Sequence, residues 1–213
     1  MVNISPKNFQ SQRLRMLDIY FATERKLIEL SWIIPLDNNP VTYSPELYSI
    51  LQSSCGQVEN MLRMLCEICK LPFSDKKFPE YYKLLDNSTN LLKRQWIYNK
   101  KTRETFHPLE IEDGCVSPSW WRGYNGTKHN LPEGLTKGNI ENTVNALGAL
   151  YAIHCISYTA QHHTKDIFET SNWFESDISL NSEYELDRVG FDTRPKSDLF
   201  YCATKFNKDG API

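Results

Sequence analysis

The most strongly patterned segment of the chain runs from Ser44 to Cys69 and reads SPELYSILQSSCGQVENMLRMLCEIC. Serine is a favoured N-cap, proline suits the first helical position, and glutamate next to them complements the positive end of the helix dipole. Apolar residues then recur with the 3.6-residue period of an α-helix, at Leu47, Leu51, Cys55, Val58, Leu62, Leu65 and Cys69. Because Pro72 follows directly, the segment predicts one long amphipathic helix that ends before it.

Weaker helical patterns flank this segment on both sides. We expect helices over residues 9–34, which Pro35 ends, over 79–95, and over 117–130, where Pro132 follows. Residues 138–162 are apolar on several sides, which predicts a central helix. Residues 95–115 fit either a small β-hairpin or an ordered loop. The sequence therefore predicts an all-α fold, a bundle of four to five helices.

The composition is that of a folded protein with little net charge. The chain has 213 residues, of which 40% are hydrophobic and 23% charged, and its net charge is −2, so neither disorder nor binding of nucleic acid by overall charge is indicated. No apolar run is long enough to span a membrane, and charged residues interrupt the N-terminal segment, so we expect a cytoplasmic protein with no membrane contact. After Thr164 the sequence becomes acidic. We expect a bundle domain over residues 1–165 and an irregular extension over 166–213 packed on it.

A dense cluster of aromatic and polar residues, WWRGYNGTKH, spans residues 120–129. On a helix, Arg122, Asn125 and His129 would share one side, because each residue advances about 100°. Arginine holds phosphate with paired hydrogen bonds, histidine transfers protons near neutral pH, and asparagine orients oxygens, so this set suits a phosphodiester. The same pattern also fits a structural role, with Lys128 and His129 complementing a helix C-terminus and Tyr124 and the two tryptophans in the core.

The string Trp-Trp-x-x-Tyr-Asn-x-x-Lys-His, set between two long helical segments, resembles the HEPN superfamily over about residues 42–165. The resemblance implies an all-helical bundle and a metal-independent endoribonuclease without cofactors. Arg122 and His129, with six residues between them, match the family's Arg–His motif and would be catalytic with Asn125, while Lys128 and Tyr124 would contact RNA. It also implies a homodimer in which two motifs meet, and a toxin–antitoxin or phage-defence setting with an antitoxin or another protein partner.

A second candidate for RNA contact is the basic segment from Lys93 to Arg103, which contains no acidic residue. Phosphates would bind its cations and bases would stack on its aromatic residues; the residues concerned are Lys93, Arg94, Trp96, Lys100, Lys101 and Arg103. A solvated loop with buried aromatics explains the segment equally well. Two functions that differ from the nuclease also remain open. One is a non-catalytic helical module that binds RNA, a nucleotide or a protein. In the other, the acidic C-terminal region is a cis inhibitor that covers the basic site.

The cysteine and histidine patterns do not favour redox or metal chemistry. Cys66 and Cys69 form a Cys-x-x-Cys pair, but they lie late in a helix, where the dipole does not stabilise a thiolate. His154 lies on an apolar face and His162-His163 lie at a helix end, so we expect no metal site and no cofactor.

Overall fold

The computed structural model describes residues 6–37, 39–74, 77–127, 131–162 and 196–203. Within these ranges the protein is mostly helical, as predicted for the fold class. The elements in chain order are α1 (Pro6–Leu30), α2 (Pro45–Ile68), α3 (Phe78–Thr89), η1 (Leu92–Arg94), β1 (Trp96–Asn99), β2 (Thr105–Phe106), α4 (Ser119–Thr127), α5 (Leu131–Gly134), η2 (Leu135–Lys137), α6 (Ile140–His162) and β3 (Phe200–Ala203).

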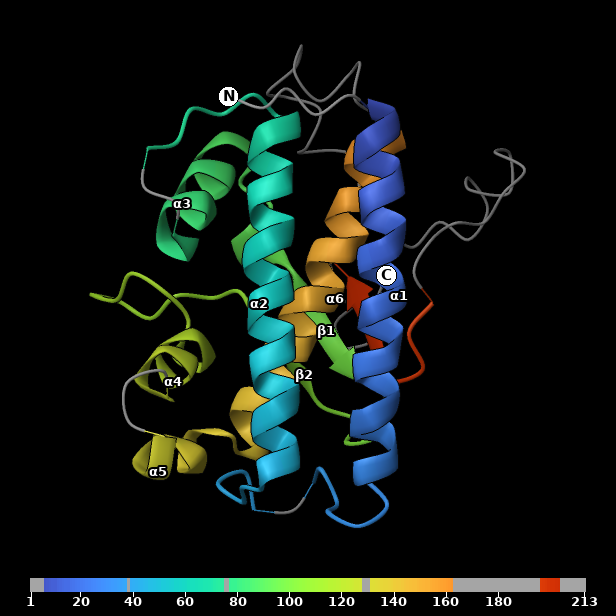
Figure 1. Ribbon diagram of the computed structural model, residues 1–213, viewed down its shortest axis with the longest axis vertical. Coiled ribbons are helices and arrows are strands. Elements are labelled where there is room, and N and C mark those ends of the chain that lie inside the picture. Colours follow the sequence, from blue (N-terminus) through green and yellow to red (C-terminus); the bar gives the residue numbers. More distant parts are fainter. Residues whose placement is uncertain (1–5, 38, 75–76, 128–130, 163–195, 204–213) are drawn as a thin grey trace, which may run out of the picture.

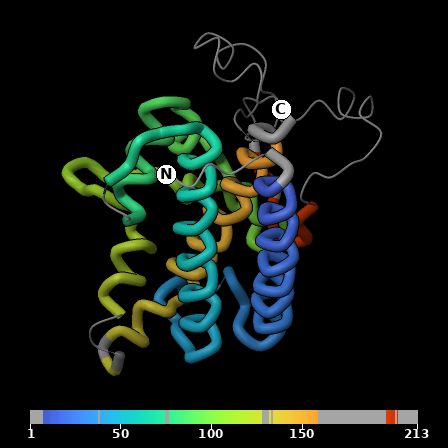
Figure 2. The backbone as a smooth tube through the Cα atoms, turned by 45° about the horizontal axis from the view of Figure 1, so that its top comes forward, coloured from blue at the N-terminus to red at the C-terminus, as the bar shows by residue number. Residues whose placement is uncertain are grey.

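Three long helices form the centre of the bundle. α1 and α2 run antiparallel, α6 packs against both of them, and α3 and α4 lie on the other side of α2 from α1 (Figures 1 and 2). α2 begins where the sequence predicts, because the Ser44 hydroxyl accepts a hydrogen bond from the backbone N–H of Leu47 at 3.1 Å. Its apolar side chains from Leu47 to Cys66 are buried in the core.

α6 is the most deeply buried helix. Ala146, Leu147, Ala149, Leu150 and Ile153 have no exposed surface, which confirms the prediction of a central helix packed on several sides. The small side chains let neighbouring elements approach closely. This helix carries much of the apolar burial that stabilises the bundle.

A small antiparallel sheet packs on α6, with strand order β2-β1-β3. β1 and β2 form a hairpin, which decides between the two alternatives for residues 95–115. β3 pairs with β1 from the other side, with Ile97 opposite Cys202. The expectation of an irregular region after residue 166 is therefore wrong for residues 200–203, where the backbone continues the sheet. Residues 163–195 and 204–213 lie outside the described residues.

Glu24 on α1 links the N-terminal helix to the segment before β3. Its buried carboxylate accepts hydrogen bonds from the hydroxyls of Tyr20, at 2.7 Å, and Ser197, and from the backbone N–H groups of Asp198 and Leu199 at 3.3 and 3.2 Å. A buried carboxylate is costly unless its lone pairs are satisfied. Four donors meet that requirement here and fix residues 197–199 against α1.

Several helix ends differ from the predicted boundaries. α1 ends at Leu30 and residues 31–34 form tight turns, since the residue before Pro35 disfavours the helical conformation. α3 ends at Thr89, where Asn90 adopts a left-handed conformation with φ 51°. None of the helices found in the described ranges combines the length and apolar character needed to cross a bilayer.

Candidate functional site

The candidate site is carried by α4, which is fixed to the bundle by its two tryptophans. Trp120 is buried and donates from its indole nitrogen to the carbonyl oxygen of Pro108 at 2.6 Å. Trp121 is also buried, and its ring stacks on Phe78 of α3 with centroids 4.2 Å apart. These contacts confirm the structural role that the sequence allowed for the tryptophan pair. They also determine which side of α4 faces solvent.

Two glycines allow the elements around α4 to pack closely. A Cβ atom at Gly123 would lie 2.9 Å from the side-chain nitrogen of Asn142 on α6, and one at Gly134 would lie 2.6 Å from Cα of Thr127. Real Cβ contacts are almost never shorter than 3.0 Å. The glycine content of this region therefore serves helix packing, and it brings the end of α4 against the start of α6.

Arg122 and Asn125 share the exposed side of α4, as the helical spacing predicts. The guanidinium of Arg122 donates from Nη1 to the carbonyl oxygen of Ser117 at 2.6 Å and from Nη2 to Oε2 of Glu112 at 2.8 Å. The side chains of Arg122 and Glu112 are 38% and 63% exposed, so water screens this ion pair. The two contacts orient the guanidinium and use two of its five N–H donors.

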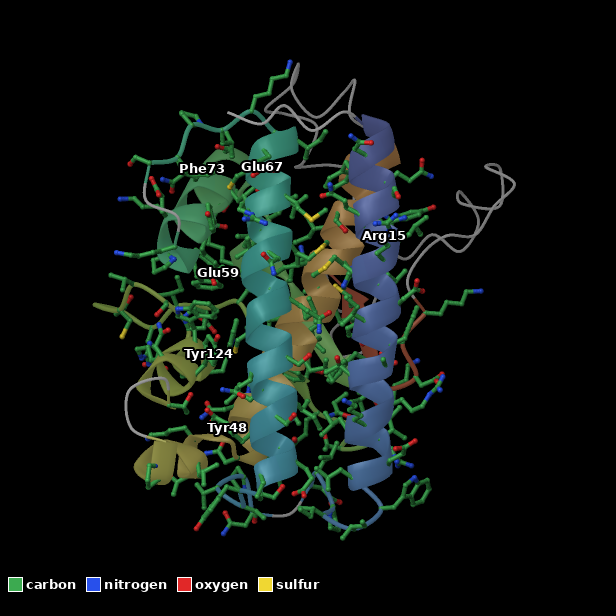
Figure 3. All side chains as sticks on the ribbon, in the orientation of Figure 1. Arg15, Tyr48, Glu59, Glu67, Phe73 and Tyr124 are labelled. Atoms are coloured by element: carbon green, nitrogen blue, oxygen red, sulfur yellow. The ribbon has the colours of Figure 1, made fainter. Side chains whose placement is uncertain are left out.

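The other residues of the motif are Tyr124, Lys128 and His129. Lys128 and His129 lie outside the described residues, so the predicted proximity of Arg122 and His129 is not tested. Tyr124, labelled in Figure 3, is half-buried and packs against Trp121 with ring centroids 5.2 Å apart. It contributes to the packing of α4, with part of its surface still accessible to a ligand.

The structure divides the basic segment into two separate groups at opposite ends of β1. Lys93 and Arg94 lie in η1, where the ammonium of Lys93 pairs with Asp86 at 3.4 Å. Lys100, Lys101 and Arg103 lie in the turn between β1 and β2. The two groups are separated by the length of β1, about 13 Å for a strand of four residues, and RNA contact by either group stays a prediction.

Trp96 is half-buried and its ring packs against His107. The aromatic residue that lies beside the cations of the turn is Trp32, which the sequence reasoning missed. The ammonium of Lys101 lies 4.2 Å from the centroid of the Trp32 ring. The only signal in the sequence was a tryptophan at the expected helix end, directly before Ile33, Ile34 and Pro35.

Two polar side chains, Arg13 of α1 and His154 of α6, are buried between these helices. Arg13 lies 5.4 Å from the ring centroid of Tyr158, and His154 packs against Tyr20 with ring centroids 5.5 Å apart. Burial, and to a smaller extent the charge of Arg13, lowers the pKa of His154 to about 3. The imidazole is therefore neutral at physiological pH.

The thiols of Cys66 and Cys69 are kept protonated by their surroundings. Burial raises the pKa of Cys66 to about 12 and that of Cys69 to about 11, which agrees with their prediction as core thiols and makes nucleophilic chemistry unfavourable. Among the residues that the structure describes, no three His, Cys, Asp or Glu side chains gather closely enough to hold a metal ion.

Comparison of the chain with protein-family models, with curated proteins and with solved structures found no match.

Proposed function

We propose that the protein is an endoribonuclease of HEPN type that cleaves RNA without a metal ion. The observation that carries the proposal is the presentation of Arg122 and Asn125 on the exposed side of α4, directly before the connection that contains His129. Contacts to Glu112 and Ser117 orient the guanidinium and leave three of its N–H donors for a phosphate. In this proposal two copies of the chain form a homodimer in which the motifs meet, in a toxin–antitoxin or phage-defence setting.

The proposed reaction is a transesterification within the RNA strand. The ribose 2′-oxygen loses its proton and forms a bond to the adjacent phosphorus, while the bond from phosphorus to the 5′-oxygen breaks and that oxygen takes up a proton. His129 transfers these protons, Arg122 stabilises the charge on the phosphoryl oxygens, and Asn125 orients the reacting group. The products are a 2′,3′-cyclic phosphate and a 5′-hydroxyl.

The test is cleavage of a panel of structured and single-stranded RNAs by the full-length protein in the presence of EDTA. Wild-type protein should produce 2′,3′-cyclic phosphate ends, and Arg122→Ala and His129→Ala should each lower the rate at least 100-fold, a typical contribution of one acid–base or charge-stabilising group. Arg63 on α2 offers a matched control, because it is an exposed arginine whose guanidinium contacts Asn60 at 3.3 Å. Intact RNA with every substrate, or cleavage by both variants at the wild-type rate, would refute the proposal.

A non-catalytic helical module is the second candidate, and the contacts of Arg122 favour it. A guanidinium that bridges the Ser117 carbonyl and the Glu112 carboxylate also has a purely structural use, since it fastens the loop before α4 to that helix. In that case Arg122→Ala and Glu112→Gln should each lower the free energy of unfolding by at most about 1 kcal/mol and should not add in the double variant. Wild-type protein would then bind a ligand without cleaving RNA.

A further inference from the structure

The end of α1 presents an unusually exposed tryptophan beside a group of cations. Trp32 is 79% exposed and Ile33 is 80% exposed, in the turns that follow Leu30. The turn between β1 and β2 reaches the same part of the molecule, near the lower half of α1 in Figure 1. It places Lys101 over the Trp32 ring, with Lys100 and Arg103 in the same connection of residues 100–104.

The backbone on both sides of this contact is well fixed. The carbonyl oxygen of the Asn99 side chain accepts hydrogen bonds from the backbone N–H groups of Lys101 and Thr102, at 2.9 and 3.3 Å. The backbone N–H of Arg103 donates to the Asn99 carbonyl at 2.8 Å, and the left-handed conformation of Arg103, φ 61°, closes the turn. The backbone that carries Lys101 and Arg103 is thus fixed before any ligand binds, which lowers the entropic cost of ordering the turn on binding.

The connection between β1 and β2, residues 100–104, carries three cations and one carboxylate, that of Glu104. Across the described part of the chain, the ion pairs found involve Lys93 and Arg122, and neither Lys101 nor Arg103 takes part in one. Lys100 donates to the carbonyl oxygen of Ser197 at 2.6 Å, which is a contact with a neutral group. An anionic ligand would therefore meet a net positive charge beside an aromatic surface.

We propose that Trp32, Lys101 and Arg103 form a docking platform for single-stranded RNA, on which a base stacks against the face of the indole opposite Lys101 and the flanking phosphates contact the two cations. The proposal rests on the proposed ribonuclease function for the choice of RNA, and it names single-stranded RNA as the substrate class. Stacking platforms of this kind combine an exposed aromatic side chain with cations that follow the backbone. A bilayer or an apolar protein surface fits less well, because either would desolvate the ammonium that lies over the ring.

Binding is measured with a fluorescently labelled 2′-O-methyl oligouridine of about 12 nucleotides, a length that matches common single-strand sites. This probe has no free 2′-hydroxyl, so the full-length wild-type protein binds it without cleaving it. Trp32→Ala should weaken binding about tenfold, the loss expected for one stacked base, and Trp32→Phe should recover most of it. Replacing both Lys101 and Arg103 by alanine should reduce the slope of log affinity against log salt by about 1.4.

Two matched controls accompany these variants. Ile33→Ala removes an apolar side chain as exposed as Trp32 but without a stacking surface, and Lys83→Ala removes an exposed cation on α3. Both should bind the oligonucleotide within about twofold of wild type, because neither residue belongs to the platform.

Three results would overturn the platform: unchanged binding by Trp32→Ala, an equal loss in Ile33→Ala, or binding to phosphatidylserine vesicles with none to the oligonucleotide. The second would indicate an apolar protein-docking surface and the third a membrane surface. Absence of cleavage in the nuclease assay would refute the proposed function and leave this binding measurement unaffected.

Discussion

Substitution of His154 by leucine should remove a pH dependence from the stability of the protein. The imidazole has no exposed surface, its ring packs against Tyr20 of α1, and the charge of Arg13, also on α1, acts on it. Its pKa is about 3 in the folded protein and about 6.5 in an unfolded chain. As the pH falls below 6.5 the unfolded chain takes up a proton that the folded protein does not, so stability decreases.

The size of the effect follows from the two pKa values. Between pH 7.5 and pH 5.5 the unfolded imidazole becomes about 90% protonated while the folded one stays neutral, which lowers the free energy of unfolding by about 1.4 kcal/mol. Urea denaturation at the two pH values measures this difference directly. Wild-type protein should lose about 1.4 kcal/mol more than His154→Leu, while His107, whose pKa burial also lowers, contributes equally to both proteins.

At pH 7.5 the leucine variant should be as stable as wild type or more stable. Neither ring nitrogen of His154 has a hydrogen-bond partner among the described residues, so an apolar side chain of similar volume leaves no donor unpaired. NMR titration of the wild-type imidazole gives an independent reading and should show no protonation down to pH 5.5. An equal pH dependence in the two proteins, or a His154 signal that titrates near pH 6.5, would refute the reasoning.

Three further substitutions test the packing. Gly123→Ala should change the free energy of unfolding little, because a gain of about 1 kcal/mol in helix propensity is offset by displacement of the Asn142 amide. In an Asn142→Ala background the same substitution should raise the free energy of unfolding, measured by chemical denaturation, by about 1 kcal/mol. Glu24→Ala should lower the free energy of unfolding by at least about 3 kcal/mol, since it leaves buried donors such as the Ser197 hydroxyl unpaired. Limited digestion with trypsin should then cleave the chain after Lys196, and unchanged proteolysis would contradict this. Ser44→Ala should lower the unfolding free energy by about 1 kcal/mol through loss of the α2 N-cap, measured by thermal melting, and no change would argue against that cap.

The helices could be predicted because their signals are local. The cap at Ser44 and the apolar period after it place α2 within one residue of its observed bounds. Predicted helix ends were less accurate where two local signals competed: the apolar pattern continued to Ile34, but Pro35 restricts the residue before it and α1 ends at Leu30.

The strand after residue 199 could not be predicted because its signal is not local. β3 is four residues long, and its partner β1 lies about 100 residues earlier in the chain. Nothing in the sequence Phe200-Tyr201-Cys202-Ala203 specifies that pairing. Short strands are determined by the surface on which they pack, here α6 and β1, more than by their own residues.

The candidate site was predictable to the extent that it depends on helical spacing. The common exposed side of Arg122 and Asn125 follows from a separation of three residues. Glu112 lies in a loop, where no repeating sequence pattern predicts its contact with Arg122. The contact between Lys101 and Trp32 joins two elements that are distant in the sequence. Trp96 was predicted to stack because it lies inside the basic segment, whereas Trp32 lies 69 positions before the Lys101 that it contacts.

The link between α1 and the segment before β3 has a consequence for biosynthesis. The hydroxyl of Ser197 that hydrogen-bonds to Glu24 is translated 173 residues after it. At 5 to 20 residues per second, the ribosome needs about 9 to 35 s to supply that partner. Of the described donors to the Glu24 carboxylate, the Tyr20 hydroxyl alone is present during this time, so α1 is synthesised early and reaches its final environment late.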